Sequence, residues 1–433
     1  MNKLVLNIIS LNILFVGCGS DNSVQSLISD SLHDADDLIT HAAQSYIQLN
    51  TDGSRLVLGA GRMPQVPYVE IELDGRARWI VAAPTGSSSI WVAVLEDGRV
   101  QAFRVKDGLW IPTEIGVNNL SPLRPPVLVI EEGLRGSLLL PPDDCAPQAY
   151  PVVSKDGRMV YISENGDLVL LDGDLRNSLP INALPDARIL LDEEGQGVVY
   201  TGPTSRYPHG ALGDALEPSG IAVFSIIEDL LLLHKFEFSA PFVAEGLAPL
   251  WFDWDGDRRR EIFVTLSEEL GGSKVAVYSE DGRLIAESDA TGSSFRWRHL
   301  LAYGSFSPTG LNELVCVRTP HTYGVVEFYQ RIENKVVRVA EIAGYTSHVF
   351  NTRNVNLSLM GDLDGDGILE VLLMDQDRSH LTAVGHRSGG ATRLWQLEIG
   401  GKATSNLTAI ALDDGSQLVG VGHDGHRLRI WGP

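Results

Sequence analysis

The sequence has few basic residues for its length, no long helical pattern and none of the common catalytic motifs. Its 433 residues include 34 Lys and Arg against 56 Asp and Glu, which gives a formal net charge of -22. A chain of this charge is repelled by nucleic-acid phosphates and by anionic lipid headgroups. We therefore expect no nucleic-acid partner, whereas divalent cations suit the charge balance.

Helical periodicity is missing from about residue 49 to the C-terminus. Short apolar runs alternate there with Asp-Gly, Asn-Gly and Gly-Gly pairs, as in residues 89–94, which are followed by Asp97-Gly98. Two apolar runs joined by such a pair are typical of a β-hairpin. The composition, 44% hydrophobic and 21% charged, is that of a globular protein. We predict an all-β fold, built either from several domains or from repeats because the chain exceeds the usual size of a single core.

Motifs of the common enzyme classes are absent. The sequence contains no G-x-S-x-G elbow, no Walker loop and no Ser-His-Asp order. His423 and His426 flank a turn but lack an identifiable third zinc ligand. Adjacent acids such as Glu193 and Glu194 point to opposite faces of a strand, so they cannot work as an acid/base pair. We therefore expect no enzymatic activity.

The N-terminus has the pattern of an export signal. A basic start with Lys3 is followed by an apolar run over residues 4–16, then by Gly17 and Cys18. The run is too short to span a bilayer comfortably. A small residue directly before a cysteine resembles the lipobox of bacterial lipoproteins. The alternative is an ordinary signal peptide with an incidental cysteine.

The lipoprotein resemblance implies an anchored protein. Residues 1–17 would be removed and Cys18 would become the lipidated first residue, held by several acyl chains because one chain binds only marginally. Gly19 in the next position resembles outer-membrane sorting. Residues 18–48 are polar and acidic, so we interpret them as a tether with room for one short helix over residues 26–39. The expected location is the bacterial cell envelope, at the outer membrane or the cell surface.

One segment near the C-terminus has the chemistry of a calcium site. Ca²⁺ takes six to eight oxygen ligands at roughly 2.3–2.6 Å, so a tight loop must turn several carboxylates inward. Acids at alternate positions achieve this, and Gly367 allows a left-handed backbone in the middle of the loop. An acidic hairpin turn would not need so many acids in register. The predicted ligands are Asp362, Asp364, Asp366, the Ile368 carbonyl and Glu370.

The same spacing recurs twice upstream. Asp253, Asp255 and Asp257 precede Glu261 by the same offsets, and hydroxyl residues take the acidic places before Glu313. We call residues 253–261 loop A, residues 305–313 loop B and residues 362–370 loop C. The closing residues Glu261, Glu313 and Glu370 are 52 and 57 positions apart.

A period near 50 in a chain of short strands indicates the blades of a β-propeller, slightly longer than the roughly 40–45 residues of WD40 blades. Eight candidate inner strands, with a gap around residues 125–140, predict seven or eight four-stranded blades over residues 49–433. The C-terminal segment 424–431 can pair with the first strands and close the ring. The eight candidates lie near residues 55–58, 90–94, 159–162, 197–200, 262–266, 314–317, 371–374 and 417–421.

Loop C resembles the calcium loop of VCBS and FG-GAP repeats, the blades of integrin α-subunit propellers. The resemblance covers about thirteen residues at loop C, is weaker at loop A and is degenerate at loop B. It implies a propeller with Ca²⁺ held in hairpin loops, over repeats at about 249–290, 301–345 and 357–400. In loop A, Arg258 stands where loop C has Gly367 and two more arginines follow, so we expect weaker binding there. We expect no ion in loop B.

Two cysteines remain besides Cys18. Cys145 and Cys316 could form one disulfide in an exported protein. They lie several repeats apart, however, and propeller blades contact mainly their neighbours. Two free, buried thiols are the better prediction.

Together these patterns favour a non-catalytic, calcium-stabilised surface propeller. We expect a monomer that recognises a protein or a glycan, or serves as a scaffold. One alternative is an exported polysaccharide lyase or hydrolase, which would require His299, Tyr303, Arg296 or similar residues to converge beside a perturbed carboxylate. The other is a scaffold lipoprotein of envelope assembly.

Overall fold

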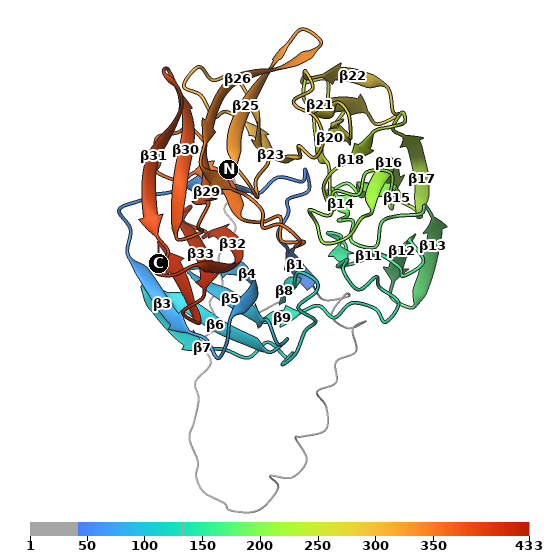
Figure 1. Ribbon diagram of the computed structural model, residues 1–433. Helices are drawn as coiled ribbons and strands as arrows, with labels where there is room; N and C mark the ends of the chain where they lie inside the picture. The colour runs from blue at the N-terminus through green and yellow to red at the C-terminus, as the bar shows by residue number, and fades with distance from the viewer. Residues whose placement is uncertain (1–41, 132–133, 433) are drawn as a thin grey trace, which may run out of the picture. The chain divides into compact units, whose positions relative to one another are not determined.

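The computed structural model describes residues 42–131 and 134–432, and strands make up their regular structure (Figure 1). The predictions for the signal peptide, for Cys18 and for a helix over residues 26–39 lie outside the described residues. Within the described part, no helix is long and apolar enough to cross a membrane.

Most strands form four-stranded antiparallel meanders in which neighbours along the chain are neighbours in the sheet. Hairpin turns with a glycine at positive φ, such as Gly98 and Gly157, connect them. Three such sheets are β4 (Ala77–Thr85), β5 (Ser88–Leu95), β6 (Val100–Lys106), β7 (Leu109–Pro112); β10 (Val152–Val153), β11 (Met159–Ile162), β12 (Asp167–Asp172), β13 (Leu175–Pro180); and β14 (Leu190–Leu191), β15 (Gln196–Thr204), β16 (Glu217–Ser225), β17 (Leu231–Glu237).

The three predicted repeats correspond to three successive meanders. In each, one of loops A, B and C connects the strand before it to the strand that begins at its closing glutamate. The strands are β18 (Val243–Ala244), β19 (Leu250–Phe252), β20 (Glu261–Glu268), β21 (Gly272–Ser279), β22 (Leu284–Glu287); β23 (Arg298–Gly304), β24 (Glu313–Arg318), β25 (Val325–Ile332), β26 (Lys335–Ala343); and β27 (Tyr345–Thr346), β28 (Ser358–Asp362), β29 (Glu370–Asp375), β30 (His380–Arg387), β31 (Gly390–Glu398).

The C-terminal strands form one sheet with a strand from the N-terminal part of the described chain. It contains β32 (Ala403–Ala411), β33 (Gln417–His423) and β34 (Arg427–Trp431), and its fourth strand is β3 (Tyr68–Glu72), which pairs antiparallel with β34. The predicted closure is therefore confirmed. One inner-strand prediction is wrong, because residues 56–60 form β2 (Leu56–Ala60), which pairs parallel with β28 at an edge instead of starting a blade. A short apolar run cannot by itself distinguish an edge strand from an inner one.

The remaining sheet corrects one boundary of the sequence analysis. β1 (Ala42–Tyr46) pairs antiparallel with β8 (Leu128–Glu131), which pairs with β9 (Gly136–Leu138). This three-stranded sheet occupies the gap that the candidate inner strands left around residues 125–140. In the described residues, Ala42–Tyr46 form a strand inside the range 18–48 expected to be a tether, since pairing with β8 gives this polar segment a place in a sheet.

Packing between the sheets places the core on both faces of each middle strand. β5 and β33 are buried along their whole length, whereas the fourth strands β7 and β13 are mostly exposed. Shared apolar clusters join the β32–β34 sheet to the β4–β7 sheet, and the β4–β7 sheet to β8 and β9. Meanders that pack face to face in a closed series, with their fourth strands outermost, are the arrangement of a β-propeller. The fold is an all-β propeller, as predicted.

Candidate metal-binding loops

Loop C brings its four acidic side chains together. Asp362, Asp364, Asp366 and Glu370 each offer a carboxylate oxygen, and these oxygens lie within 4.8 Å of one another. Gly367 has φ of +84°, a left-handed conformation that side chains other than glycine rarely adopt. The loop thus places four carboxylates around one point, as the alternate spacing predicted. The Ile368 carbonyl as a ligand stays a prediction.

Backbone amides hold these carboxylates in place. The Leu363 amide donates to Glu370 Oε2 at 2.7 Å, and the Gly367 amide donates to Asp362 Oδ2 at 3.2 Å. The Ile368 amide donates to Asp366 Oδ1 at 2.8 Å. These bonds fix one oxygen of each carboxylate, so that the second oxygen of Asp362 and of Glu370 is left for another partner.

Those second oxygens have no hydrogen-bond partner. Asp362 Oδ1 and Glu370 Oε1 are buried without one, and the Glu370 side chain is fully buried. The Arg387 guanidinium lies 3.6 Å from Glu370 Oε1, beyond hydrogen-bond range, and 3.2 Å from Asp366 Oδ2. Burial, together with the charges of the three aspartates, raises the pKa of Glu370 to about 8. A buried oxygen without a donor costs roughly 1–3 kcal/mol or more, so these residues are suited to a bound cation.

Loop A brings together only three of its four predicted acids. Oxygens of Asp253, Asp255 and Glu261 lie within 4.8 Å of one another, whereas Asp257 is outside this group and accepts a hydrogen bond from the Arg259 amide at 2.7 Å. Arg258 takes the left-handed conformation, with φ of +72°, that Gly367 takes in loop C. A longer side chain in a strained position and a missing carboxylate both agree with the expectation of a weaker site.

Loop A also has a cation from outside its own meander. Arg331 Nη1 lies 3.4 Å from Asp255 Oδ2, and its guanidinium stacks 4.3 Å from the Trp254 ring centroid. Arg331 belongs to β25 of the next meander, so the sequence of loop A gives no indication of it. This cation takes part of the negative charge that an ion would otherwise neutralise.

Loop B replaces the acidic cluster with protein contacts. Ser307 Oγ lies 3.1 Å from Thr309 Oγ1, and Glu313 is fully buried. His386 Nδ1 lies 2.8 Å from Glu313 Oε1, and the Gln330 amide donates to the same oxygen at 2.8 Å. Sequence reasoning missed both partners, because they come from β30 and β25 and no local spacing connects them to loop B.

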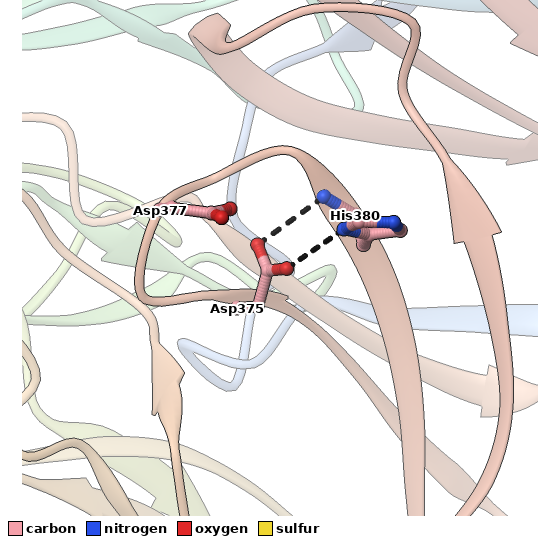
Figure 2. A group of neighbouring side chains, drawn as sticks. All are labelled: Asp375, Asp377 and His380. Atoms are coloured by element: carbon pink, nitrogen blue, oxygen red, sulfur yellow. Dashed lines mark hydrogen bonds and ion pairs between the residues drawn. The ribbon is translucent and has the colours of Figure 1, made fainter.

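A further acidic group lies in the turn between β29 and β30. Figure 2 shows Asp375, Asp377 and His380 around this turn, with the His380 ring directed at Asp375. His380 Nδ1 lies 2.9 Å from Asp375 Oδ2, and the Ser379 amide donates to Asp375 Oδ1 at 3.0 Å and to Asp377 Oδ1 at 2.8 Å. These side chains close a hairpin turn.

Other hairpins of this chain use the same bonds. In the turn between β14 and β15, the Gln196 amide donates to Asp192 Oδ1 at 2.7 Å. In the turn between β32 and β33, the Ser416 amide donates to Asp414 Oδ1 at 2.9 Å. The carboxylates of Asp375 and Asp377 therefore act as turn acceptors. Unlike Asp362 and Glu370 of loop C, they have no buried oxygen without a partner.

A group of aromatic and histidine side chains lies away from the loops. The His209 ring stacks on Phe295 with centroids 4.7 Å apart, and its Nδ1 is paired with the buried Glu245 carboxylate. The His321 ring lies 5.5 Å from His209, and burial and then His209 lower the pKa of His321 to about 4. The ring of buried His348 lies 6.1 Å from His321. We call these residues the histidine group.

The three residues required by the enzyme alternative do not meet in one place. His299 is buried and its Nδ1 lies 2.8 Å from Ser347 Oγ. Tyr303 stacks on Phe252 next to loop A, and Arg296 is exposed. The histidine group is the convergence that the sequence did not identify, since His209, His321 and His348 come from separate segments.

The cysteines agree with the sequence analysis. Cys145 and Cys316 are buried and free, as predicted. Burial raises the pKa of Cys145 to about 11, so it carries no thiolate at neutral pH and is no nucleophile.

The sheets and loops thus define a β-propeller with acidic clusters in loops A and C. No family model matches the chain, and no curated protein matches it. The likeness of loop C to VCBS and FG-GAP loops therefore stays a prediction.

Solved structures are similar in fold. A europium-containing methanol dehydrogenase is 10% identical, over 89% of this chain and 90% of that chain, with a TM-score of 0.44. The C-terminal WD40 domain of Sif2 is 10% identical, over 86% and 99%, with a TM-score of 0.43. A streptogramin B lyase is 12% identical, over 84% and 97%, with a TM-score of 0.40. Likenesses at this level concern the fold and say nothing about activity.

Proposed function

We propose that this protein is a non-catalytic, calcium-stabilised propeller that a lipid anchor displays on a bacterial envelope, where it recognises a protein or glycan. The observation that carries the calcium part is the convergence of four carboxylates in loop C around two buried oxygens without partners. Asp362, Asp364, Asp366 and Glu370 would hold the ion. When bound, Ca²⁺ would neutralise their mutual repulsion and stabilise the folded state by binding that state alone.

The position of loop C supports a structural role for the bound ion. It connects β28 to β29, and β29 is almost completely buried between neighbouring sheets. The carboxylates come from one short loop that encloses them, which leaves few positions for a substrate. The ion therefore serves the fold, and recognition belongs to other surfaces of the propeller.

The lipid anchor can be tested by replacing Cys18, the residue that would be acylated. Cys18→Ser is expected to move the full-length protein from the membrane fraction to the soluble fraction of a bacterial host, because the substituted residue cannot be acylated. The readout is fractionation with detergent phase separation, with Cys145→Ser as the control, since Cys145 is buried in the propeller. Membrane association that persists in Cys18→Ser would refute the anchor.

The histidine group favours a second candidate, an exported enzyme acting on polysaccharide. The buried Glu245 carboxylate is paired with Nδ1 of His209 and accepts from Ser267 Oγ, so His209 presents Nε2 as its basic nitrogen. Phe295 and Phe350, both partly exposed, flank this ring. Such a pair could remove a proton from a sugar ring or activate water.

One experiment separates recognition from catalysis. The purified protein is incubated with a panel of acidic and neutral polysaccharides, with and without calcium, and both binding and new reducing or unsaturated ends are measured. Calcium-dependent binding without chain cleavage is expected for a recognition protein. Cleavage that disappears in His209→Gln, and persists in the turn variant His380→Gln, would instead establish the enzyme.

A further inference from the structure

Two buried arginines have no carboxylate ion-pair partner among the described residues. Arg55 directly precedes β2 and Arg188 precedes β14, and their exposed fractions are 8% and 3%. Both donate to one acceptor, Asn356 Oδ1, from Arg55 Nε and from Arg188 Nη1 at 3.3 Å, and Arg188 Nη2 also donates to the Arg353 carbonyl at 3.0 Å. Among the described residues, neither forms an ion pair with any carboxylate.

A small cavity lies against both guanidinium groups. Its volume is about 30 Å³, and Arg55, Arg188, His299, Glu245 and Thr265 are among the residues that line it. Arg55 also lines a larger cavity of about 290 Å³. Since one water needs roughly 10–15 Å³ of such space, the small cavity admits a monatomic ligand or one of a few atoms.

Hydrogen-bond donors exceed acceptors around these arginines. Asn356 Nδ2 and the Tyr150 hydroxyl are buried without a partner. The Tyr150 ring lies 5.9 Å from the Arg188 guanidinium carbon. Because Asn356 Oδ1 already serves two arginines, its amide nitrogen is left as a further free donor beside them.

The nearby acceptors are already used. Glu245 lines the cavity, but its carboxylate is bound to His209 and Ser267. Asp186 attracts Arg188, but its Oδ2 accepts from Arg353 Nε at 2.8 Å. The positive charge of the two arginines is therefore left without a dedicated counter-charge.

Electrostatics make this arrangement costly for the protein alone. Burial, and then the charge of Arg188, lower the pKa of Arg55 to about 9, so Arg55 still carries its charge at neutral pH. Burial and the two arginines lower the pKa of His299 well below its ordinary value, so this ring is neutral. Buried charges are normally paired, because an isolated one loses its hydration without compensation.

We propose that Arg55 and Arg188, which both line this cavity, bind one small monovalent anion of the size of chloride or formate there. The anion supplies the missing counter-charge and joins segments that precede β2 and β14. A larger oxyanion such as sulfate exceeds the space. Because the chain as a whole carries a formal charge of -22, its general field does not attract anions, and binding requires a built site.

The test is thermal unfolding of the full chain at constant ionic strength and constant calcium, in sodium gluconate, chloride, bromide, formate or sulfate. The folded-to-unfolded ratio rises by a factor of one plus ligand concentration over Kd, which is about 100-fold at a hundredfold excess over Kd. We expect chloride and bromide, or formate, to raise the melting temperature by several degrees over gluconate. Sulfate stabilises folded proteins generally, so its effect should be the same in the wild type and in the site variants below. Halide and formate arms distinguish an inorganic ion from a small carboxylate. Equal melting temperatures in all five salts would overturn the proposal.

Two variants separate the site from general salt effects. Asn356→Asp places a fixed carboxylate between the arginines, so it is expected to fold and to make the melting temperature independent of the anion. Arg55→Met removes one charge and should abolish anion dependence too. Arg99→Met is the matched control, because Arg99 is exposed and paired with Asp97, and it should keep the wild-type dependence.

Crystals soaked in bromide give a direct readout. An anomalous peak between Arg55 and Arg188, missing in Asn356→Asp crystals, is the expected result. The same anion dependence in wild type and Asn356→Asp, or bromide peaks only at the surface, would refute a built site.

Discussion

Replacing Asp362 and Asp364 together by alanine is expected to abolish the rise in melting temperature that calcium gives the wild-type protein. Each supplies one of the four carboxylates that converge in loop C. Loss of two from a site that needs six to eight oxygens removes most of the affinity. At a calcium concentration of 100 times Kd, the wild type gains about 2.7 kcal/mol of unfolding free energy that the variant does not. Melting curves in calcium and in EDTA measure the difference.

The matched control also removes two aspartate carboxylates, but from a different turn of the same sheet. Asp375 and Asp377 form the other acidic group of this sheet, but their oxygens accept from turn amides. Asp375→Ala with Asp377→Ala should lower stability in calcium and in EDTA alike and leave the calcium effect intact. If the wild type melts at the same temperature in calcium and in EDTA, loop C is not a calcium site.

The calcium effect should also depend on pH, with a sign that Glu370 determines. Its pKa is raised to about 8 in the folded protein without an ion, so the folded state keeps a proton that the unfolded state releases above about 4.5. Without calcium, this residue's contribution to stability is therefore full at low pH and is lost as the pH rises towards 8, by at most about 1.4 kcal/mol per pH unit. Calcium displaces that proton, so its stabilising effect should grow over the same range.

How far the sequence determines this molecule differs between its parts. Loop C could be predicted because all four carboxylates come from nine consecutive residues, and their spacing alone brings them together. The hairpins could be predicted for the same reason, since turn residues and apolar alternation are local signals. The closure through β34 joins segments far apart in the sequence, but it could be predicted because a propeller ring closes when its last segment pairs with an early strand. The pairing of β1 with β8 could not, because it joins segments more than eighty residues apart.

The side chains that contact the charged groups of these loops from distant segments could not be predicted from the sequence either. Arg331 and His386 reach loops A and B from the following meander, and Arg55 and Arg188, far apart in sequence, share the acceptor Asn356. A sequence shows that such residues exist but not which neighbour they face. For this reason Asp257 was placed among the ligands of loop A, although its carboxylate turns towards the Arg259 amide.

The three repeats show two ways of neutralising the same closing glutamate. In loop C, Glu370 has an oxygen without a donor, and we assign a cation to it. In loop B, His386 and Gln330 contact Oε1 of the fully buried Glu313 directly; its Oε2 is also buried without a partner, but loop B has no other carboxylate beside it. The blade that contains loop B thus relies on protein side chains where its neighbour relies on an ion. It also contains the most highly connected buried charge among the described ion pairs, Glu327.

Replacing Glu327 by alanine is expected to cost roughly 3–5 kcal/mol of unfolding free energy, the usual penalty for breaking a buried ion pair. Glu327 is fully buried in β25, and its carboxylate accepts from Arg318 Nε and Arg338 Nη1 at 2.7 Å and from Arg298 Nε at 3.1 Å. Burial alone would raise the pKa of Glu327, but Arg298 and Arg318 hold it below its ordinary value. Removing the carboxylate leaves Arg298, which is 1% exposed, as a buried cation without its counter-charge.

Glu341→Ala is the matched control for this prediction. Glu341 contacts two of the same arginines, Arg338 at 3.1 Å and Arg318 at 3.5 Å, but its side chain is 47% exposed. Water screens such a pair, so its loss should cost less than about 1 kcal/mol. Urea unfolding in EDTA separates this effect from calcium binding, because Glu327 belongs to the blade that carries loop B. If Glu327→Ala and Glu341→Ala were equally mild, the buried arginines would not depend on Glu327, and the blade without an acidic cluster would owe its stability to apolar packing alone.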